Sequence, residues 1–440
     1  MRYSDFMKKT LKKMNKAFAR GKSAQISVSN RSDVQKFLSK VAAMPKAAGD
    51  AHMIFALDAT ASREQTWGVA KQLQTEMFLS AQSLGGLNLQ LCYFRGFAEF
   101  FASRWENNAD EIVRIMAGMD CQAGVTQIER VLAHAINENL ILSSYLKKSD
   151  SGTYTYDVIL SLQKLSGEKV KEDFLLHTDG VKAEHGFVSI IPNHNQGFFI
   201  TWLDGRNTVD KDLDGYHKPM TIRFAEITNK GDIIDESELD SATCDCCQTS
   251  IAVTNKGPVV VYRDRSDKEV RDIYIARKIN GIWGVPTPIH NDGWEINGCP
   301  VNGPKVASNS NNLAISWFTV SNEKPTVNLS FSKSNGASFG TPIKINDVDA
   351  IGRVDVAFLN PQEVLVSYIE GDDVGTYLRI KKVSIDGKVS APITISKIDG
   401  GRNSGVPQLE ILDNEAFIVW TVFEGEKNQL KTVKLSFKNT

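Results

Sequence analysis

The sequence predicts an all-β six-bladed propeller over residues 139–440, with incomplete first and last blades, preceded by a truncated α/β unit within residues 1–138. Three observations predict this fold. An apolar strand ending in an aromatic residue recurs every 51 to 60 residues, each copy has alternating strands on either side, and polar turn residues separate them. Radial repetition of four-stranded units is the pattern of a β-propeller.

The recurring aromatic residue, called the anchor below, marks the second strand predicted for each blade. Five anchors follow a further apolar strand, which we expect to be the first strand of the blade and to line the central channel. Blade one lacks that strand because residues 126–137 have a helical pattern, and the last blade lacks a fourth strand. The six anchors are Tyr145, Trp202, Tyr262, Trp317, Tyr368 and Trp420.

The overall composition points away from some partners. Lys and Arg number 51 against 52 Asp and Glu, so the net charge of −1 argues against nucleic acid as a partner. No stretch has the roughly 18 uncharged apolar residues of a membrane span. Residues 1–25 are basic but lack the apolar core of a signal peptide, so we expect a cytoplasmic chain.

Residues 52–57 predict a strand, and a turn containing Asp58, Thr60 and Ser62 follows it. A helical pattern at 67–84, strands at 87–94 and 97–101, and helices at 108–119 and 127–137 come next. The turn resembles the metal-dependent adhesion site of the von Willebrand factor A family, with Thr in place of the middle Ser. That resemblance implies Mg²⁺ or Mn²⁺ bound by Asp58, Thr60, Ser62 and Thr126, and a protein partner; a simple helix N-cap is the alternative.

In the remaining chain, the turn SKSNGASF at 332–339 is close to an Asp box, and the segments CDCCQTS (244–250), VVYRDRS (260–266) and GCPVNGP (298–304) are distinctive. These features resemble sialidase-like propellers with Asp-box (BNR) repeats, in particular a poorly characterised bacterial group. The resemblance implies an extracytoplasmic propeller that binds a glycan or another small ligand on its axis. The alternatives are an exo-glycosidase of sialidase type and a protein-interaction module without catalysis.

Polar residues just before the predicted first strands should gather at one mouth of the channel and form a site. The resemblance implies acids and an arginine at the reacting sugar, for which Glu184, Asp355 and Arg353 are the candidates. The family's Phe-Arg-Ile-Pro motif is absent, and Arg206 alternatively pairs with Asp204. The predicted ligand-binding residues are His185, Asp245, Gln248, Asn302 and Arg206.

Four of the six cysteines lie in this region: Cys244, Cys246, Cys247 and Cys299. Three interpretations stay open. Cys299 forms a disulfide with one of the other three and joins adjacent blades, or the four thiolates hold Zn²⁺ or copper, or they are buried thiols.

The missing strands of both units meet near residue 139. This coincidence suggests the hypothesis that the chain is chimeric and joins two unrelated gene fragments.

Overall fold

A computed structural model of the chain describes most residues from 51 to 437. The predicted helix at 127–137 lies outside the described residues. The described ranges are 51–61, 67–68, 71–72, 74–78, 87–96, 99–106, 109–123, 140–149, 154–165, 167–193, 197–210, 217–401, 404–412, 415–424 and 427–437.

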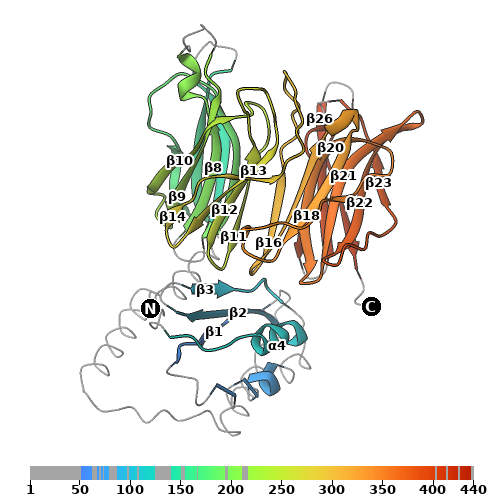
Figure 1. The fold of residues 1–440 in the computed structure, drawn as a ribbon. Helices are drawn as coiled ribbons and strands as arrows, with labels where there is room; N and C mark the ends of the chain where they lie inside the picture. Colours follow the sequence, from blue (N-terminus) through green and yellow to red (C-terminus); the bar gives the residue numbers. More distant parts are fainter. Residues whose placement is uncertain are drawn as a thin grey trace.

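Residues 140–437 form six small antiparallel sheets, an arrangement consistent with a β-propeller (Figure 1). The first three sheets contain β4 (Leu140–Lys148), β5 (Tyr156–Lys164) and β6 (Lys169–Leu175); β7 (His185–Asn193), β8 (Gly197–Asp204), β9 (Met220–Thr228) and β10 (Ile233–Thr243); β11 (Ser250–Thr254), β12 (Gly257–Arg263), β13 (Ile273–Ile279), β14 (Ile282–Trp283) and β15 (Thr287–His290). The next three contain β16 (Lys305–Asn309), β17 (Asn312–Thr319), β18 (Thr326–Ser332) and β19 (Ile343–Lys344); β20 (Asp349–Asn360), β21 (Glu363–Asp372), β22 (Gly375–Ser384) and β23 (Ile393–Lys397); β24 (Gln408–Leu412), β25 (Glu415–Glu424) and β26 (Lys427–Ser436). Two short 3₁₀ turns are η2 (Arg206–Val209) and η3 (Ser321–Glu323).

The first strands of successive sheets contact one another in the order β7, β11, β16, β20 and β24. These are the five first strands that the sequence predicted. Separate apolar clusters fill the spaces between neighbouring sheets, so the core lies between sheets rather than at one centre. Within the described residues, the first and sixth sheets have three strands each.

The anchors explain the repeat physically. Five lie on the second strands β8, β12, β17, β21 and β25, and none of these five is more than 7% exposed. Buried Trp and Tyr need a partner for their polar atom. The indole nitrogens of Trp202 and Trp317 donate to Asp204 and Asp292, at 2.8 and 2.7 Å.

Tyr145 differs from the other five anchors in its exposure. It lies on β4, the first described strand of its sheet, and is 45% exposed. The middle strand is β5, which buries Val158, Leu160 and Leu162. A second strand without an inner strand beside it is an edge strand, so its aromatic residue stays exposed.

The Asp-box-like turn joins β18 to β19, between third and fourth strands as predicted. The Ser332 hydroxyl accepts hydrogen bonds from the backbone N–H groups of Ser334 and Gly336. Asn335 and Gly336 have φ of 54° and 78°, which asparagine and glycine tolerate best. The turn is held by its own side chains and has a structural role.

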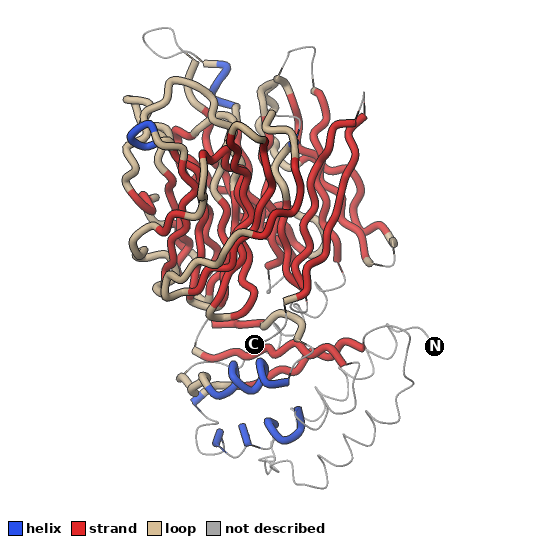
Figure 2. The backbone as a smooth tube through the Cα atoms, turned by 90° about the vertical axis from the view of Figure 1, so that its right-hand side faces the viewer, coloured by secondary structure: helices blue, strands red, loops and turns tan. Residues whose placement is uncertain are grey.

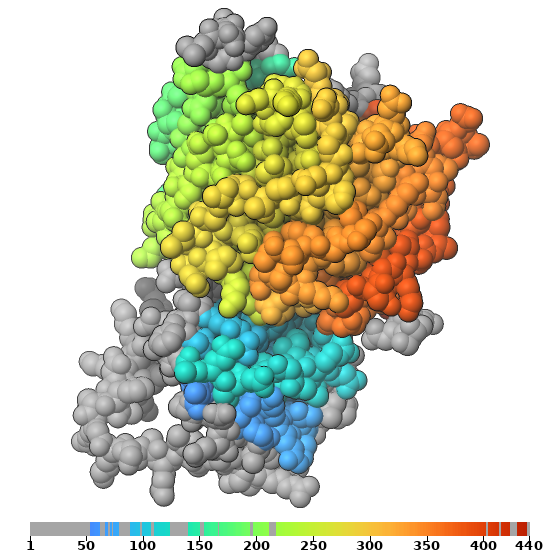
Figure 3. Space-filling model, in the orientation of Figure 1, coloured from blue at the N-terminus to red at the C-terminus, as the bar shows by residue number. Residues whose placement is uncertain are grey.

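The N-terminal residues described here form the sheet β1 (Ala51–Asp58), β2 (Leu87–Arg95) and β3 (Glu99–Ala102), with β1 parallel and β3 antiparallel to β2. Helix α4 (Ala109–Ala117) buries Ile112 and Met116 in the same apolar cluster as β2. This part lies against one end of the upright sheets (Figure 2, Figure 3). These elements do not establish an A-like domain, which stays a prediction. Within the described residues, no helix is long and apolar enough to cross a membrane.

Candidate functional site

The predicted mouth residues form hydrogen bonds between neighbouring sheets. Between the fourth and fifth sheets, the Asn302 amide oxygen accepts from Arg353 N at 2.7 Å, and its nitrogen donates to Ile351 O at 3.0 Å. Between the fifth and sixth, the Arg353 guanidinium donates to Ser404 Oγ and Gly400 O. Arg353 is 8% exposed. Its described contacts therefore serve packing between sheets.

Gln248 forms a similar contact between the third and fourth sheets. Its side-chain oxygen accepts a hydrogen bond from Gly303 N at 2.9 Å. A Cβ on residue 303 would lie 1.9 Å from the carbonyl oxygen of Gln248, so only glycine fits there. The two loops are thus held in direct backbone contact.

Glu184 and Asp245 belong to a second, more exposed group. Burial and the nearby Asp245 charge raise the pKa of Glu184, although His185 opposes this shift. Asp245 accepts hydrogen bonds from Met220 N and from Arg265, at 2.8 and 2.7 Å. The largest charge effect on Glu184 thus comes from another carboxylate.

His185 is fully buried, and its ring stacks on His177 with centroids 3.6 Å apart and an angle of 8°. Its Nδ1 is 3.1 Å from Tyr156 O, and its Nε2 is 3.1 Å from an Asp179 oxygen. Asp204 lies 3.6 Å away. Histidines and carboxylates so close are metal-ligand types. However, an imidazole nitrogen binds a metal in its ring plane, so two parallel rings cannot both direct a lone pair at one ion.

Arg206 pairs with Asp204, as the alternative to ligand binding predicted. Its Nε and Nη2 donate to the two carboxylate oxygens, each at 2.8 Å, and Asp179 and Glu236 lie 3.2 Å away. Burial alone would raise the pKa of Asp204, but the bonds from Arg206 lower it to about 2. The guanidinium already has carboxylate partners.

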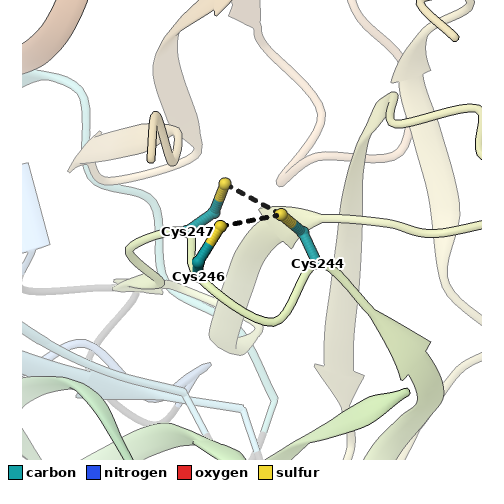
Figure 4. A group of neighbouring side chains, drawn as sticks. All are labelled: Cys244, Cys246 and Cys247. Carbon is teal, nitrogen blue, oxygen red and sulfur yellow. Dashed lines mark hydrogen bonds between the residues drawn. The ribbon is translucent and has the colours of Figure 1, made fainter. Parts of the chain in front are cut away.

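Cys246 and Cys299 form a disulfide between the loops that precede β11 and β16, as one of the three interpretations predicted. The other two cysteines of the cluster, Cys244 and Cys247, are free thiols, each 1% exposed. Cys244 Sγ lies 3.0 Å from Cys247 Sγ and 3.9 Å from Cys246 Sγ (Figure 4). Because metals bind thiolates and not disulfides, a metal at this cluster would first require reduction of that bond.

The thiols differ in acidity. The hydrogen bond with Cys247 lowers the pKa of Cys244, against the effect of burial, and the charges of Arg263 and Arg271 contribute. Burial raises the pKa of Cys247. Cys244 and Cys247 have Cys-x₂-Cys spacing, a signal that is easily overlooked when the three adjacent cysteines are read as one run.

A cavity of about 1830 Å³ lies on the channel axis next to the N-terminal sheet. Its wall includes residues of β7, β11, β16, β20 and β24, and the segment 100–106 closes one side. Arg104 from this segment donates to Phe358 O on β20 at 2.5 Å. The sequence pointed to the opposite ends of the first strands, so it missed this cavity.

Asp355 is the one predicted site residue in the cavity wall. Its oxygens accept hydrogen bonds from Val356 N and Leu409 N, at 2.8 and 2.9 Å. Burial raises the pKa of its carboxyl, although Lys305, 3.8 Å away, lowers it. Lys305 Nζ also donates to the side-chain oxygen of Gln408 at 3.1 Å.

The predicted metal turn is described only in part. Asp58 Oδ1 accepts hydrogen bonds from Thr60 N and Thr60 Oγ1, at 3.0 and 2.7 Å, which is an Asx-turn. Ser62 and Thr126 lie outside the described residues. A site for Mg²⁺ or Mn²⁺ thus stays a prediction.

No protein-family model matches the sequence, and no curated protein matches it. Among solved structures, a Hadza microbial sialidase aligns with 64% of this chain at 12% identity and a TM-score of 0.42. A polysaccharide lyase, an ulvan lyase, aligns with 67% of this chain and 76% of its own at 10% identity and a TM-score of 0.40. An α-L-arabinofuranosidase from Lactobacillus brevis aligns with 56% of this chain and 92% of its own at 16% identity and a TM-score of 0.33. The chain spans 61% of the sialidase and 57% of a Bombyx mori β-fructofuranosidase.

Proposed function

We propose that this protein binds an uncharged glycan in the axial cavity. The observation that carries the proposal is the cavity itself, enclosed by first strands of five sheets. Pockets for drug-sized ligands measure about 300–1,000 Å³. A volume of about 1830 Å³ therefore has room for several linked sugars.

The lining suits a ligand with both hydroxyl groups and apolar faces. Lys305, which donates a hydrogen bond to Gln408 and forms an ion pair with Asp355, is the centre of a polar group in the wall, while Trp105 and Phe417 contribute aromatic surface. Sugars offer hydroxyls to such polar groups and C–H faces to aromatic rings. Few specific polar groups in a larger apolar wall are typical of ligand sites.

The charge of the lining argues against an acidic sugar. Six acidic and four basic residues face the cavity, and Arg104 and Lys305 already have oxygen partners. A sialic acid carboxylate would need a free guanidinium. For this reason we propose a neutral glycan and not a sialoside.

Titration calorimetry with neutral xylo-, arabino- and malto-oligosaccharides, and with sialyllactose as the acidic comparison, tests this proposal. We expect a neutral oligosaccharide to bind, and Gln408→Leu to weaken binding at least about 10-fold, because a bidentate-capable amide is lost from the wall. Lys344→Met, on the exposed strand β19, is the control and should bind like wild type. The absence of binding to every neutral oligosaccharide, or a preference for sialyllactose, would refute the proposal.

A second candidate is exo-glycosidase activity with Asp355 as general acid. The observation that favours it is the raised pKa of this carboxyl in the cavity wall, since a proton must be retained near neutral pH. A panel of fluorogenic glycosides, sialosides included, tests it. Turnover that Asp355→Asn abolishes would support an enzyme, whereas no turnover of any glycoside would leave binding alone.

A further inference from the structure

The cysteine cluster places a thiol beside a disulfide. Cys244 Sγ is 3.9 Å from Cys246 Sγ, which is bonded to Cys299. Its other neighbour is the thiol of Cys247, 3.0 Å away. Thiol–disulfide exchange requires a nucleophilic thiol, a disulfide sulfur within reach and a leaving thiol, and all three are present here.

The surroundings of the cluster favour an anionic sulfur. Arg263 is 2% exposed and donates its three hydrogen bonds to backbone carbonyl oxygens, not to a carboxylate. Arg271 is also buried. Buried positive charge close to a thiol promotes the thiolate, which is the reactive form.

The two ends of the disulfide differ in exposure. Cys299 is exposed, whereas Cys246 is half-buried and faces the free thiols. A thiolate released at Cys299 is therefore solvated, and it is accessible to other molecules. Cys244 and Cys247, at 1% exposure, are shielded from them.

We infer that Cys244, Cys246, Cys247 and Cys299 form a thiol–disulfide relay that exchanges electrons with low-molecular-weight disulfides at Cys299. In the first step, the Cys244 thiolate attacks Cys246 Sγ. The Cys244–Cys246 bond forms as the Cys246–Cys299 bond breaks, and Cys299 leaves with the electron pair as a surface thiolate.

In the second step, Cys247 attacks Cys244 Sγ. The Cys244–Cys247 bond forms, Cys246 leaves with the electron pair, and the proton of Cys247 passes to it. The disulfide has moved inward without net oxidation. The surface pair can then reduce an external disulfide: the Cys299 thiolate attacks it and releases one thiol, and Cys246 resolves the mixed disulfide and releases the second.

The experiment uses the full-length protein, purified without reductant and incubated with iodoacetamide at pH 7.5. The acid-quenched protein is mapped by mass spectrometry. The relay predicts carbamidomethylated Cys299 and a trapped Cys244–Cys247 disulfide, although Cys299 is bonded at the start. An intact Cys246–Cys299 bond, with label on Cys244 or on no cysteine of the cluster, would overturn the inference.

Controls separate exchange from unfolding. Cys92 is fully buried on β2, so its labelling in step with Cys299 would indicate global unfolding and would also overturn the inference. Cys244→Ser should slow Cys299 labelling at least about 50-fold, whereas Cys121→Ser should leave it unchanged.

A second measurement in the wild type avoids dependence on a variant that folds poorly. With excess oxidised glutathione as the external disulfide, the relay predicts release of two equivalents of reduced glutathione per protein and both disulfides in the product. Release of none, with Cys244 and Cys247 still thiols, would contradict it.

Discussion

Arg263 is predicted to be one of the most sensitive positions in the molecule. Its guanidinium donates to Asn302 O at 2.9 Å and to Arg271 O and Phe318 O at 2.6 Å, and it lies over the Trp294 ring. These bonds join the end of β12 to the fourth sheet. Replacement by methionine keeps the apolar stem but leaves three buried carbonyls without a donor.

The magnitude follows from the hydrogen bonds. An unsatisfied buried polar group costs roughly 1–3 kcal/mol, so three of them suggest a loss of about 3–9 kcal/mol for Arg263→Met. Arg263→Lys keeps the charge but has a shorter reach and no planar fork, so about 1–3 kcal/mol is expected. Since whole domains are stable by only about 5–15 kcal/mol, the methionine variant should be severely destabilised.

Urea unfolding followed by tryptophan fluorescence measures these losses. Arg223→Met is the matched control, because Arg223 pairs with Glu236 and Glu238 near the surface. Such pairs contribute about 0–1 kcal/mol. An Arg263→Met variant within about 1 kcal/mol of wild type, no worse than Arg223→Met, would refute the structural role of Arg263.

Two further predictions concern pH and the anchors. Burial and the neighbouring Asp240 raise the pKa of Asp264 to about 7, so the folded protein binds more protons at Asp264 than the unfolded chain between about pH 4 and 7. Stability from this group is present below pH 4 and lost as pH rises to 7. The Asp264→Asn side chain resembles the protonated carboxyl. Its free energy of unfolding should therefore exceed that of wild type by on the order of 2 kcal/mol at pH 8, after allowance for partial exposure, and equal it at pH 4. An equal difference in urea unfolding at both pH values would contradict this. Trp202→Ala should cost about 3–5 kcal/mol by thermal or urea unfolding, and Tyr145→Ala less than about 1 kcal/mol, because only Trp202 is buried; similar losses in the two variants would contradict this difference in burial.

The repeat was predictable because a buried second strand has a recognisable local sequence pattern. A buried aromatic residue in the middle of an apolar strand recurs at each second strand, and five positions from Trp202 to Trp420 follow that rule. Tyr145 is exposed because, among the described residues, β4 has no inner strand beside it and β5 is the middle strand of the sheet. The disulfide was predictable as one of three interpretations, because Cys299 had no cysteine near it in sequence.

The site was harder to predict because its partners are backbone atoms. The sequence indicated that Asn302 and Arg353 are polar residues before first strands, but not that Ile351 O and Gly400 O face them. Carbonyl acceptors are the same at every residue, so no motif reveals them. The cavity depends on where segment 100–106 lies in space, which is a long-range arrangement.

The polar residues before the first strands and the axial cavity therefore have different roles. In a ring of separate sheets, backbone polar groups lie at each seam, which is the boundary between two neighbouring sheets. Buried polar groups need hydrogen-bond partners. Asn302, which precedes β16, and Arg353, which lies within β20 and not before it as predicted, provide those partners, so these polar residues have a structural cause that requires no ligand. Asp355 belongs to both sets: it accepts a hydrogen bond from Leu409 N across a seam and lines the cavity beside Lys305. Loss of stability at Asp355 would thus be no evidence of catalysis, so the binding of a sugar has to be tested at Gln408, an exposed residue of the cavity wall whose side chain accepts a hydrogen bond from Lys305.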